Sequence, residues 1–152
     1  VFEFKFKNFL GGKWLRFGEW GNDKHIRLFN RVNIKWNDAD VHESLLLSKD
    51  AKVISIPGYV LHKTADSFYE YECKMENYAR MNAEKYFKQQ KASGSFKIFF
   101  PAIFSFMKNY FFKLGFLDGA TGYHCARINA RYTFLKYKKL DELWEKTGRK
   151  LS

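Results

Sequence analysis

A change of hydrophobic period near Thr64 is the feature that most limits the folds open to this 152-residue chain. Before it, apolar and polar residues alternate, most clearly over Phe2–Lys7, which is typical of strands with one buried face. After it, apolar residues recur at helical spacing for most of the remaining chain. Strands followed by helices predict an α+β fold.

The first part contains several short strand candidates separated by turn residues. Gly11-Gly12 is a turn signal between the first alternating run and a second one over Lys13–Phe17. Further strands are expected at His25–Arg31 and Val53–Leu61. Pro57-Gly58 interrupts the last of these, which leaves open one strand or two.

About three helices are expected after Thr64. Ser67 and Glu70 have the spacing of a capping box, so a helix of about 20 residues should begin there. A polar linker at Gln89–Ser95 leads to a second helix over Phe96–Leu114, for which Gly115 is a natural C-cap.

The third helix is expected over Thr121–Lys146. This reading divides the chain into a β-rich region, residues 1–63, and a helical, basic region, residues 64–152.

The formal charge of +11 indicates an anionic partner, such as membrane lipid, a phosphorylated ligand or nucleic acid. Aromatic residues make up 20% of the chain, which excludes a disordered basic tail. Nucleic acid is disfavoured, because no helix-turn-helix, zinc-finger or RNA-binding signature is present. Basic residues interleaved with Phe, Tyr and Leu suit either an anionic membrane surface or ordinary helices with solvated lysines. They are Lys108, Lys113, Arg127, Arg131, Lys136, Lys138 and Lys139.

The most apolar segment, Ile98–Met107, is too short to cross a bilayer, for which about 20 residues are needed. We expect a buried helix or one that lies in the bilayer interface. Cys73 and Cys125 lack metal-type spacing and are expected to be buried, reduced thiols. The chain begins at Val1 inside a strand pattern without a signal peptide, so we interpret it as a fragment or a processed chain.

Four segments carry residue types suited to chemistry. Glu43 beside His42 could act as a general base or help to bind a metal, although the pair alone favours a surface Glu and a satisfied His, because His-Glu dipeptides are common. His62 could bind a metal or a phosphate, or merely cap a helix. Arg27 could clamp a diphosphate, or be a surface charge. Asp38-Ala39-Asp40 has the pattern of a metal–nucleotide site, but no buried strand precedes it, so a solvated turn is favoured.

Trp14, Trp20 and Trp36 could offer flat faces to sugar rings, although aromatic residues more often belong to a core.

A set of different short motifs follows in order along nearly the whole chain. It comprises Gly12–Arg16, Gly18–Trp20, Ile26–Phe29, Val41–Glu43, Leu61-His62, Lys74, Asn77–Ala79, Ala83, Phe116–Gly119, Gly122 and Phe134–Tyr137. Together these motifs resemble the C-terminal part of bacterial family 2 glycosyltransferases. The closest subgroup is the lipopolysaccharide core sugar transferases of the β-1,4-glucosyltransferase type.

The resemblance implies a partial GT-A fold, with acceptor-side β segments followed by amphipathic helices. It implies inverting transfer of a sugar from a nucleotide-sugar donor to a lipid-linked saccharide, with a divalent cation, Mg or Mn, for the leaving diphosphate. The enzyme would sit peripherally on the cytoplasmic face of the bacterial inner membrane. The nucleotide-binding half, with the family's Asp-x-Asp motif, would precede Val1, so the fragment alone should be inactive.

The resemblance also assigns roles by position. Glu43 would be the catalytic base, with His42 orienting it. His62 would complete the metal or diphosphate site, and Arg27 would contact phosphate. Trp14 and Trp20 would stack on the acceptor.

Two other functions remain as alternatives. One is a non-enzymatic, basic, amphipathic membrane-binding module. The other is a nucleic-acid binder, which the charge alone favours.

Overall fold

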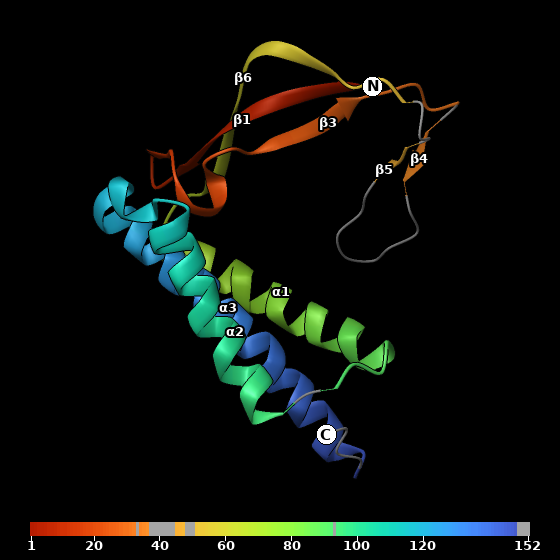
Figure 1. Ribbon diagram of the computed structural model, residues 1–152, viewed down its shortest axis with the longest axis vertical. Helices are drawn as coiled ribbons and strands as arrows, with labels where there is room; N and C mark the ends of the chain where they lie inside the picture. Colours follow the sequence, from red (N-terminus) through yellow and green to blue (C-terminus); the bar gives the residue numbers. More distant parts are fainter. Residues whose placement is uncertain (33, 37–44, 48–50, 93, 149–152) are drawn as a thin grey trace.

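A computed structural model of the chain shows a small sheet at one end and three helices at the other (Figure 1). The structure describes residues 1–32, 34–36, 45–47, 51–92 and 94–148. The α+β class expected from the sequence is confirmed. The side chains of Lys35 and Trp36 lie outside the described part, as do residues 37–44.

The sheet is built around β1, Phe2–Leu10. Two antiparallel neighbours, β2 (Lys13–Leu15) and β3 (Lys24–Leu28), pair with opposite ends of β1. The long strand β6, Ile54–Ala65, runs parallel to β1 along nearly its whole length. Because β6 pairs with the same residues as β2 and β3 do, it must occupy the other edge of β1.

The segment around Pro57-Gly58 is part of one continuous strand, which answers the question that the sequence left open. The register against β1 shifts between Glu3 and Lys5, where Gly58 has a φ of 101°. A proline cannot donate to the ladder, and a glycine tolerates this backbone, so the strand is irregular here without ending.

A separate pair of short strands, β4 (Lys35–Trp36) and β5 (Leu45–Leu46), forms a second small sheet.

Helix α1, Phe68–Lys88, begins where the capping box predicts. The Glu70 amide donates to Ser67 Oγ at 3.1 Å, and the Glu70 carboxylate accepts from the Asp66 amide at 2.7 Å. Helix α3, Gly119–Lys146, packs against both α1 and α2 (Figure 1). One core cluster joins the sheet to α1 and α3, and its buried residues are Leu10, Leu15, Ala65, Tyr71, Cys125 and Ile128.

The second helix differs from the expectation of one helix to Leu114 with Gly115 as its cap. Helix α2 covers Ser95–Met107, a π-helical turn (η2) follows at Lys108–Phe112, and Leu114 itself takes the left-handed conformation with a φ of 58°. Gly115 serves close packing instead, because a Cβ there would lie 2.5 Å from the Asn109 carbonyl oxygen. Its place is in the 3₁₀ turn η3, Gly115–Asp118.

The two cysteines also differ from expectation. Cys125 is buried, as predicted, but Cys73 is exposed on α1, so that part of the prediction is wrong. Both are free thiols. Burial raises the pKa of Cys125 to about 12, and the nearby Asp118 carboxylate adds to the rise.

Among the described residues, no helix has the length and apolar character needed to cross a membrane.

Candidate functional site

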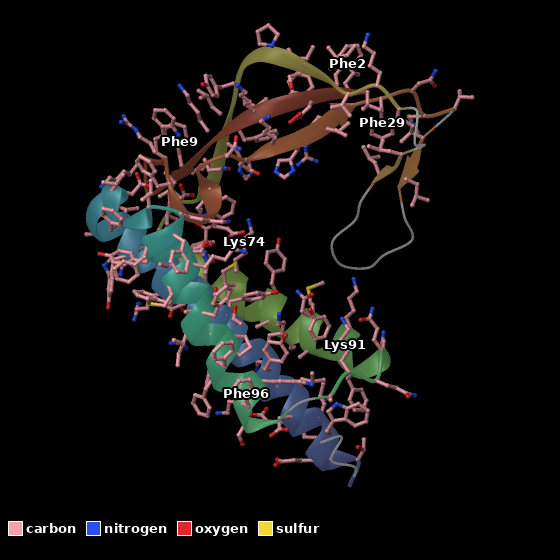
Figure 2. All side chains as sticks on the ribbon, in the orientation of Figure 1. Phe2, Phe9, Phe29, Lys74, Lys91 and Phe96 are labelled. Atoms are coloured by element: carbon pink, nitrogen blue, oxygen red, sulfur yellow. The ribbon has the colours of Figure 1, made fainter. Side chains whose placement is uncertain are left out.

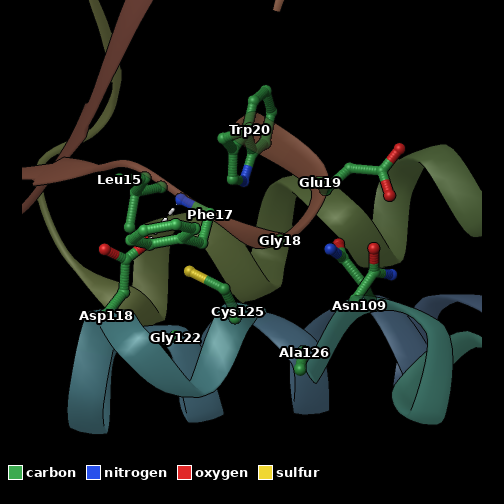
Figure 3. Close-up of a pocket in the computed structure, with 12 residues that line it drawn as sticks. Leu15, Phe17, Gly18, Glu19, Trp20, Asn109, Asp118, Gly122, Cys125 and Ala126 are labelled. Atoms are coloured by element: carbon green, nitrogen blue, oxygen red, sulfur yellow. Dashed lines mark hydrogen bonds between the residues drawn. The ribbon is translucent and has the colours of Figure 1, made fainter. Parts of the chain in front are cut away.

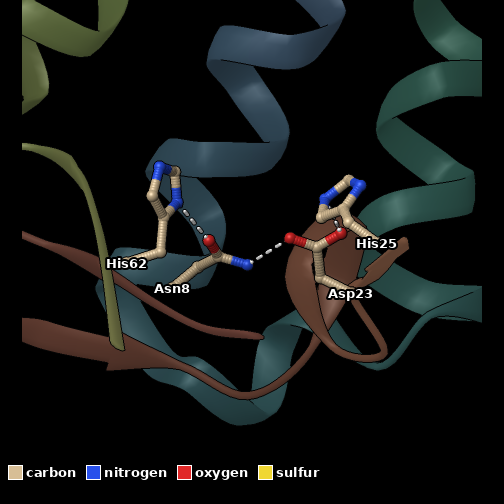
Figure 4. A network of polar contacts seen from close by, with 4 residues as sticks. All are labelled: Asn8, Asp23, His25 and His62. Atoms are coloured by element: carbon tan, nitrogen blue, oxygen red, sulfur yellow. Dashed lines mark hydrogen bonds and ion pairs between the residues drawn. The ribbon is translucent and has the colours of Figure 1, made fainter. Parts of the chain in front are cut away.

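A chain of four polar side chains crosses one face of the sheet (Figure 4). Asn8 on β1 lies at its centre, fully buried. Its Oδ1 is 2.7 Å from Nδ1 of His62 on β6, and its Nδ2 donates to Asp23 Oδ2 at 2.8 Å. Asp23 Oδ1 in turn contacts His25 Nε2 at 2.8 Å. We call these four residues the sheet network.

The hydrogen-bond roles within the sheet network follow from the carboxylate of Asp23. A carboxylate only accepts, so Asn8 must present its amide N–H to Asp23 and its carbonyl oxygen to His62. His62 must therefore donate from Nδ1, and in the neutral ring Nε2 carries the lone pair. A buried amide thus selects the tautomer of an exposed imidazole.

An aromatic ring and a cation complete this face. The Phe6 ring meets His25 and His62 edge-on, with ring centroids 5.0 and 6.0 Å apart. The Arg27 guanidinium carbon lies 5.7 Å from the Phe6 centroid. Arg27 and His62, which the sequence singled out separately, therefore share one sheet face around Phe6. The structure brings these two predicted site residues together; their roles stay predictions.

Sequence reasoning missed Asn8, Asp23 and His25. Asn8 did carry a signal, since it occupies an inward position in a run whose other members at that period are Phe and Leu. A polar residue at a core position needs a partner, and its partners here are the site residues themselves. Asp23 and His25 offered no comparable pattern.

The sheet network can supply one ligand to a metal, through Nε2 of His62. A metal-bound histidine usually donates its second ring N–H to a protein oxygen, which is what His62 does toward Asn8. The described residues contain no group of three His, Cys, Asp or Glu side chains that could hold a metal ion by themselves. The predicted divalent cation would thus need further ligands.

Trp14 and Trp20 lie apart from the sheet network. Trp14 pairs with Phe9, and its ring has Lys7 Nζ at 4.4 Å and the Arg16 guanidinium at 4.6 Å from its centroid. Lys7 alternates with Phe6 and Asn8, so this group occupies the opposite sheet face. Trp14 also borders an open depression together with Lys13, Arg16, Phe17, Leu117, Asp118 and Gly119.

Trp20 packs against the core cluster, with its ring centroid 6.2 Å from that of Tyr71. The substrate roles of Trp14 and Trp20 stay predictions.

Asp118 connects the sheet to the helices (Figure 3). Its Oδ2 accepts from the backbone amides of Arg16 and Phe17, each at 2.9 Å, and its backbone oxygen accepts from Lys13 Nζ at 3.1 Å. Gly122 lies beside Asp118 and very close to Gly115. A Cβ added at Gly122 would lie 1.8 Å from the Gly115 carbonyl oxygen.

We call the contact region around Asp118, Gly115 and Gly122 the joint. The cavity beside it measures about 10 Å³, the size of one water molecule. The joint is therefore a packing feature, and it accounts for Asp118 of the Phe116–Gly119 motif, whereas Phe116 and Leu117 are exposed.

His42, Glu43 and Asp38-Ala39-Asp40 lie outside the described residues. The structure thus bears on Arg27, His62, Trp14 and Trp20 among the predicted site residues.

Comparison with known proteins gives one informative similarity. The chain is 27% identical over 128 residues to an uncharacterized glycosyltransferase of Rickettsia typhi, and the match covers 80% of this chain and 44% of that protein. The chain therefore spans less than half the length of the relative. No family model and no solved structure matches the chain. The similarity supports a glycosyltransferase-like origin.

Proposed function

We propose that this chain is the acceptor-side and C-terminal part of an inverting family 2 glycosyltransferase with a GT-A fold. Its donor would be a nucleotide sugar, and its acceptor a lipid-linked saccharide of the lipopolysaccharide core type. The reaction would take place at the cytoplasmic face of a bacterial inner membrane. The similarity to a glycosyltransferase supports the general class.

The observation that carries the proposal is the gathering of Arg27 and His62 on one sheet face. Arg27 would contact the departing diphosphate, for which a guanidinium is well shaped. His62, held by Asn8 with its Nε2 lone pair available, would be one ligand of the cation that the donor brings. When bound, Mg²⁺ or Mn²⁺ would offset the charge of the leaving group.

Glu43 would remove the proton from the attacking acceptor hydroxyl, and His42 would orient it. Inversion requires one displacement at the anomeric carbon, in which the acceptor oxygen forms the new bond as the diphosphate oxygen leaves. The base and the leaving group must then lie on opposite sides of the sugar. Trp14 and Trp20 are proposed to contact the acceptor.

The test uses the product of the complete reading frame that contains this chain. Glu43→Gln should lower turnover about 10²-fold or more while donor binding persists. His62→Gln should lower turnover about 10- to 100-fold and raise the cation concentration needed for half-maximal rate. Lys63→Gln, at the exposed residue beside His62 that pairs with Asp66, is the matched control. Unchanged turnover in Glu43→Gln would remove Glu43 as the base.

A second candidate function is a membrane-binding module without enzymatic activity. A helix with an exposed apolar face, α2, favours it. A complete protein that binds lipid vesicles but neither binds nucleotide sugars nor transfers sugar would support this candidate against the first.

A further inference from the structure

Helix α2 has an unusual surface for a helix at the outside of a protein. Its sequence is apolar nearly all round, yet it packs mainly against α3 and leaves its outer side uncovered. The outer side consists of Phe96, Phe99, Phe100, Ile103, Phe104 and Met107, whose exposed fractions run from 39% to 74%. We call these six residues the outer stripe. Single exposed apolar residues are common in proteins, but a continuous exposed stripe marks an interaction surface.

The geometry of the outer stripe is that of one helix face. Its residues follow the spacing i, i+3, i+4, i+7, i+8 and i+11, so they line up along the axis. The rings of Phe96, Phe100 and Phe104 stack in sequence, with centroids 5.0 and 6.5 Å apart. On the inner side, Phe106 meets Tyr123 of α3 edge-on at 6.0 Å. Figure 2 shows Phe96 at the end of α2 remote from the sheet.

Charge points to the nature of the partner. From Ser95 to Leu117 the chain has three lysines and no carboxylate. Lys97 and Lys108 are eleven residues apart, about three turns, so they border the outer stripe on the same side. Lys113 pairs with Glu19 at 3.3 Å and is partly neutralised. Two lysines beside exposed phenylalanines match an anionic bilayer surface, where apolar rings enter the acyl region and lysines reach phosphates.

The basic residues of α3 are engaged differently. Arg131 pairs with Glu72 at 3.2 Å and with Glu76 at 2.6 Å on α1. Lys136 lies over the rings of Tyr86 and Tyr137, at 5.0 and 4.7 Å. These two charges belong to the packing between α1 and α3. The lysines of α2 instead border exposed apolar rings, which is the arrangement that a lipid surface requires.

We propose that the outer stripe of α2 is a membrane-contact surface that lies in the interface of an anionic bilayer, parallel to it. The helix has 13 residues, which corresponds to about 20 Å, against the roughly 30 Å of a hydrocarbon core. It lies on the membrane and does not span it. A second copy of the chain is a poorer occupant, because self-association through this face would bring Lys97 and Lys108 of both copies together. The inference goes beyond the proposed reaction, since lipid binding requires neither donor nor turnover.

The test is sedimentation of the product of the complete reading frame that contains this chain, with vesicles of phosphatidylcholine, alone or mixed with phosphatidylglycerol. The parent chain should bind the mixed vesicles more tightly, and binding should weaken as salt is added. The double variant Phe100→Ser/Phe104→Ser should reduce the affinity at least tenfold. Lys97→Gln/Lys108→Gln should reduce affinity for mixed vesicles roughly tenfold, with little change on phosphatidylcholine.

The matched control is Tyr59→Ser/Leu61→Ser, which removes comparably exposed apolar side chains from β6 and should leave binding unchanged. Circular dichroism must show that every variant retains the helical content of the parent. A further variant, Phe104→Trp, should gain fluorescence quenching by lipids brominated in their acyl chains. The proposal is overturned if the parent does not bind, if both double serine variants lose binding equally, or if Phe104→Trp gains no quenching. Concentration-dependent dimers that Phe100→Ser/Phe104→Ser abolishes, without vesicle binding by the parent, would instead assign the surface to a second copy.

Discussion

The joint and the sheet network are both polar contacts between segments far apart in the sequence, but they differ in what they leave exposed. In the joint, the Asp118 carboxylate is buried and accepts from two backbone amides, so its hydrogen bonds are directed inward. In the sheet network, buried Asn8 hydrogen-bonds the exposed imidazole of His62 directly and is linked to that of His25 through Asp23. A buried polar group that hydrogen-bonds the backbone contributes to the stability of the fold, whereas one that hydrogen-bonds an exposed side chain fixes the orientation of that side chain. Variants at the two places should therefore separate stability from activity.

The largest effect is expected from Gly122→Ala. A methyl group at this position would lie 1.8 Å from the Gly115 carbonyl oxygen, so α3 and η3 must move apart. We expect a loss of about 3 kcal/mol in the free energy of unfolding, measured by urea denaturation, although alanine is the better helix former. Arg127→Ala, at an exposed site on the same helix, should stay within about 0.5 kcal/mol of the parent. An equally stable Gly122→Ala would contradict the close packing of the joint.

Asp118→Ala should cost about 2 to 3 kcal/mol, because it removes a buried carboxylate and leaves the partly buried amides of Arg16 and Phe17 without an acceptor. Asp118→Asn retains a carbonyl oxygen and should recover part of this loss. Urea denaturation measures both. If the asparagine variant were no better than the alanine variant, the two amide contacts would not be the source of the stability.

The sheet network should separate its buried member from its exposed one. Asn8→Ala removes two hydrogen bonds from a fully buried position and should cost about 1 to 2 kcal/mol. His62→Gln, at an exposed position, should cost less than about 0.5 kcal/mol in the same urea experiment. In the complete enzyme the order should differ, since His62→Gln is expected to impair turnover despite its small effect on folding. A large stability loss in His62→Gln would make this histidine a structural residue.

The smallest effect concerns pH and the thiol beside the joint. Burial raises the pKa of Cys125 from its ordinary 9.0 to about 12 in the folded chain. The unfolded chain therefore loses this proton first, so the stabilising contribution is complete below pH 9 and is lost as the pH rises toward 12. One such group adds a slope of at most about 1.4 kcal/mol per pH unit. Urea denaturation from pH 8 to 10 should show a shallower decline for Cys125→Ala than for the parent.

Cys73→Ala, at the exposed thiol, is the control for this experiment and should decline as the parent does. Identical slopes in all three proteins would show that Cys125 is accessible to solvent in the folded state.

Local signals in the sequence predicted the helices better than the joint between them. The capping box at Ser67 placed the start of α1, because it depends on residues three positions apart. The sequence prediction for the end of α2, Leu114, is wrong, because Gly115 looks like a helix cap when only its neighbours in the sequence are considered. Its actual constraint is the approach of Gly122 and the Asn109 carbonyl, which only the folded chain brings near.

The same reasoning applies to the candidate site. The residue types of Arg27 and His62, and their places near strand ends, make them site candidates from the sequence. That they share one sheet face follows only from the pairing of β3 and β6 with β1. Asp23 became part of the sheet network only through Asn8, a contact between residues 15 positions apart. Pairing across strands cannot be read from alternation alone, because the pattern gives the face of a residue but not its neighbours.

Strand β6 has a consequence for handling the chain by itself. It pairs with β1 along one edge, and within the described residues no strand pairs with the other. Such an edge is a template on which other chains can add strands, and exposed Leu61 would make that addition more favourable. Pro57, which lacks an amide hydrogen, the irregular backbone at Gly58 and a second register shift after Lys63 limit the regular template to Tyr59–Lys63. Pro57→Thr should therefore make the isolated chain aggregate at a lower concentration, which light scattering would detect.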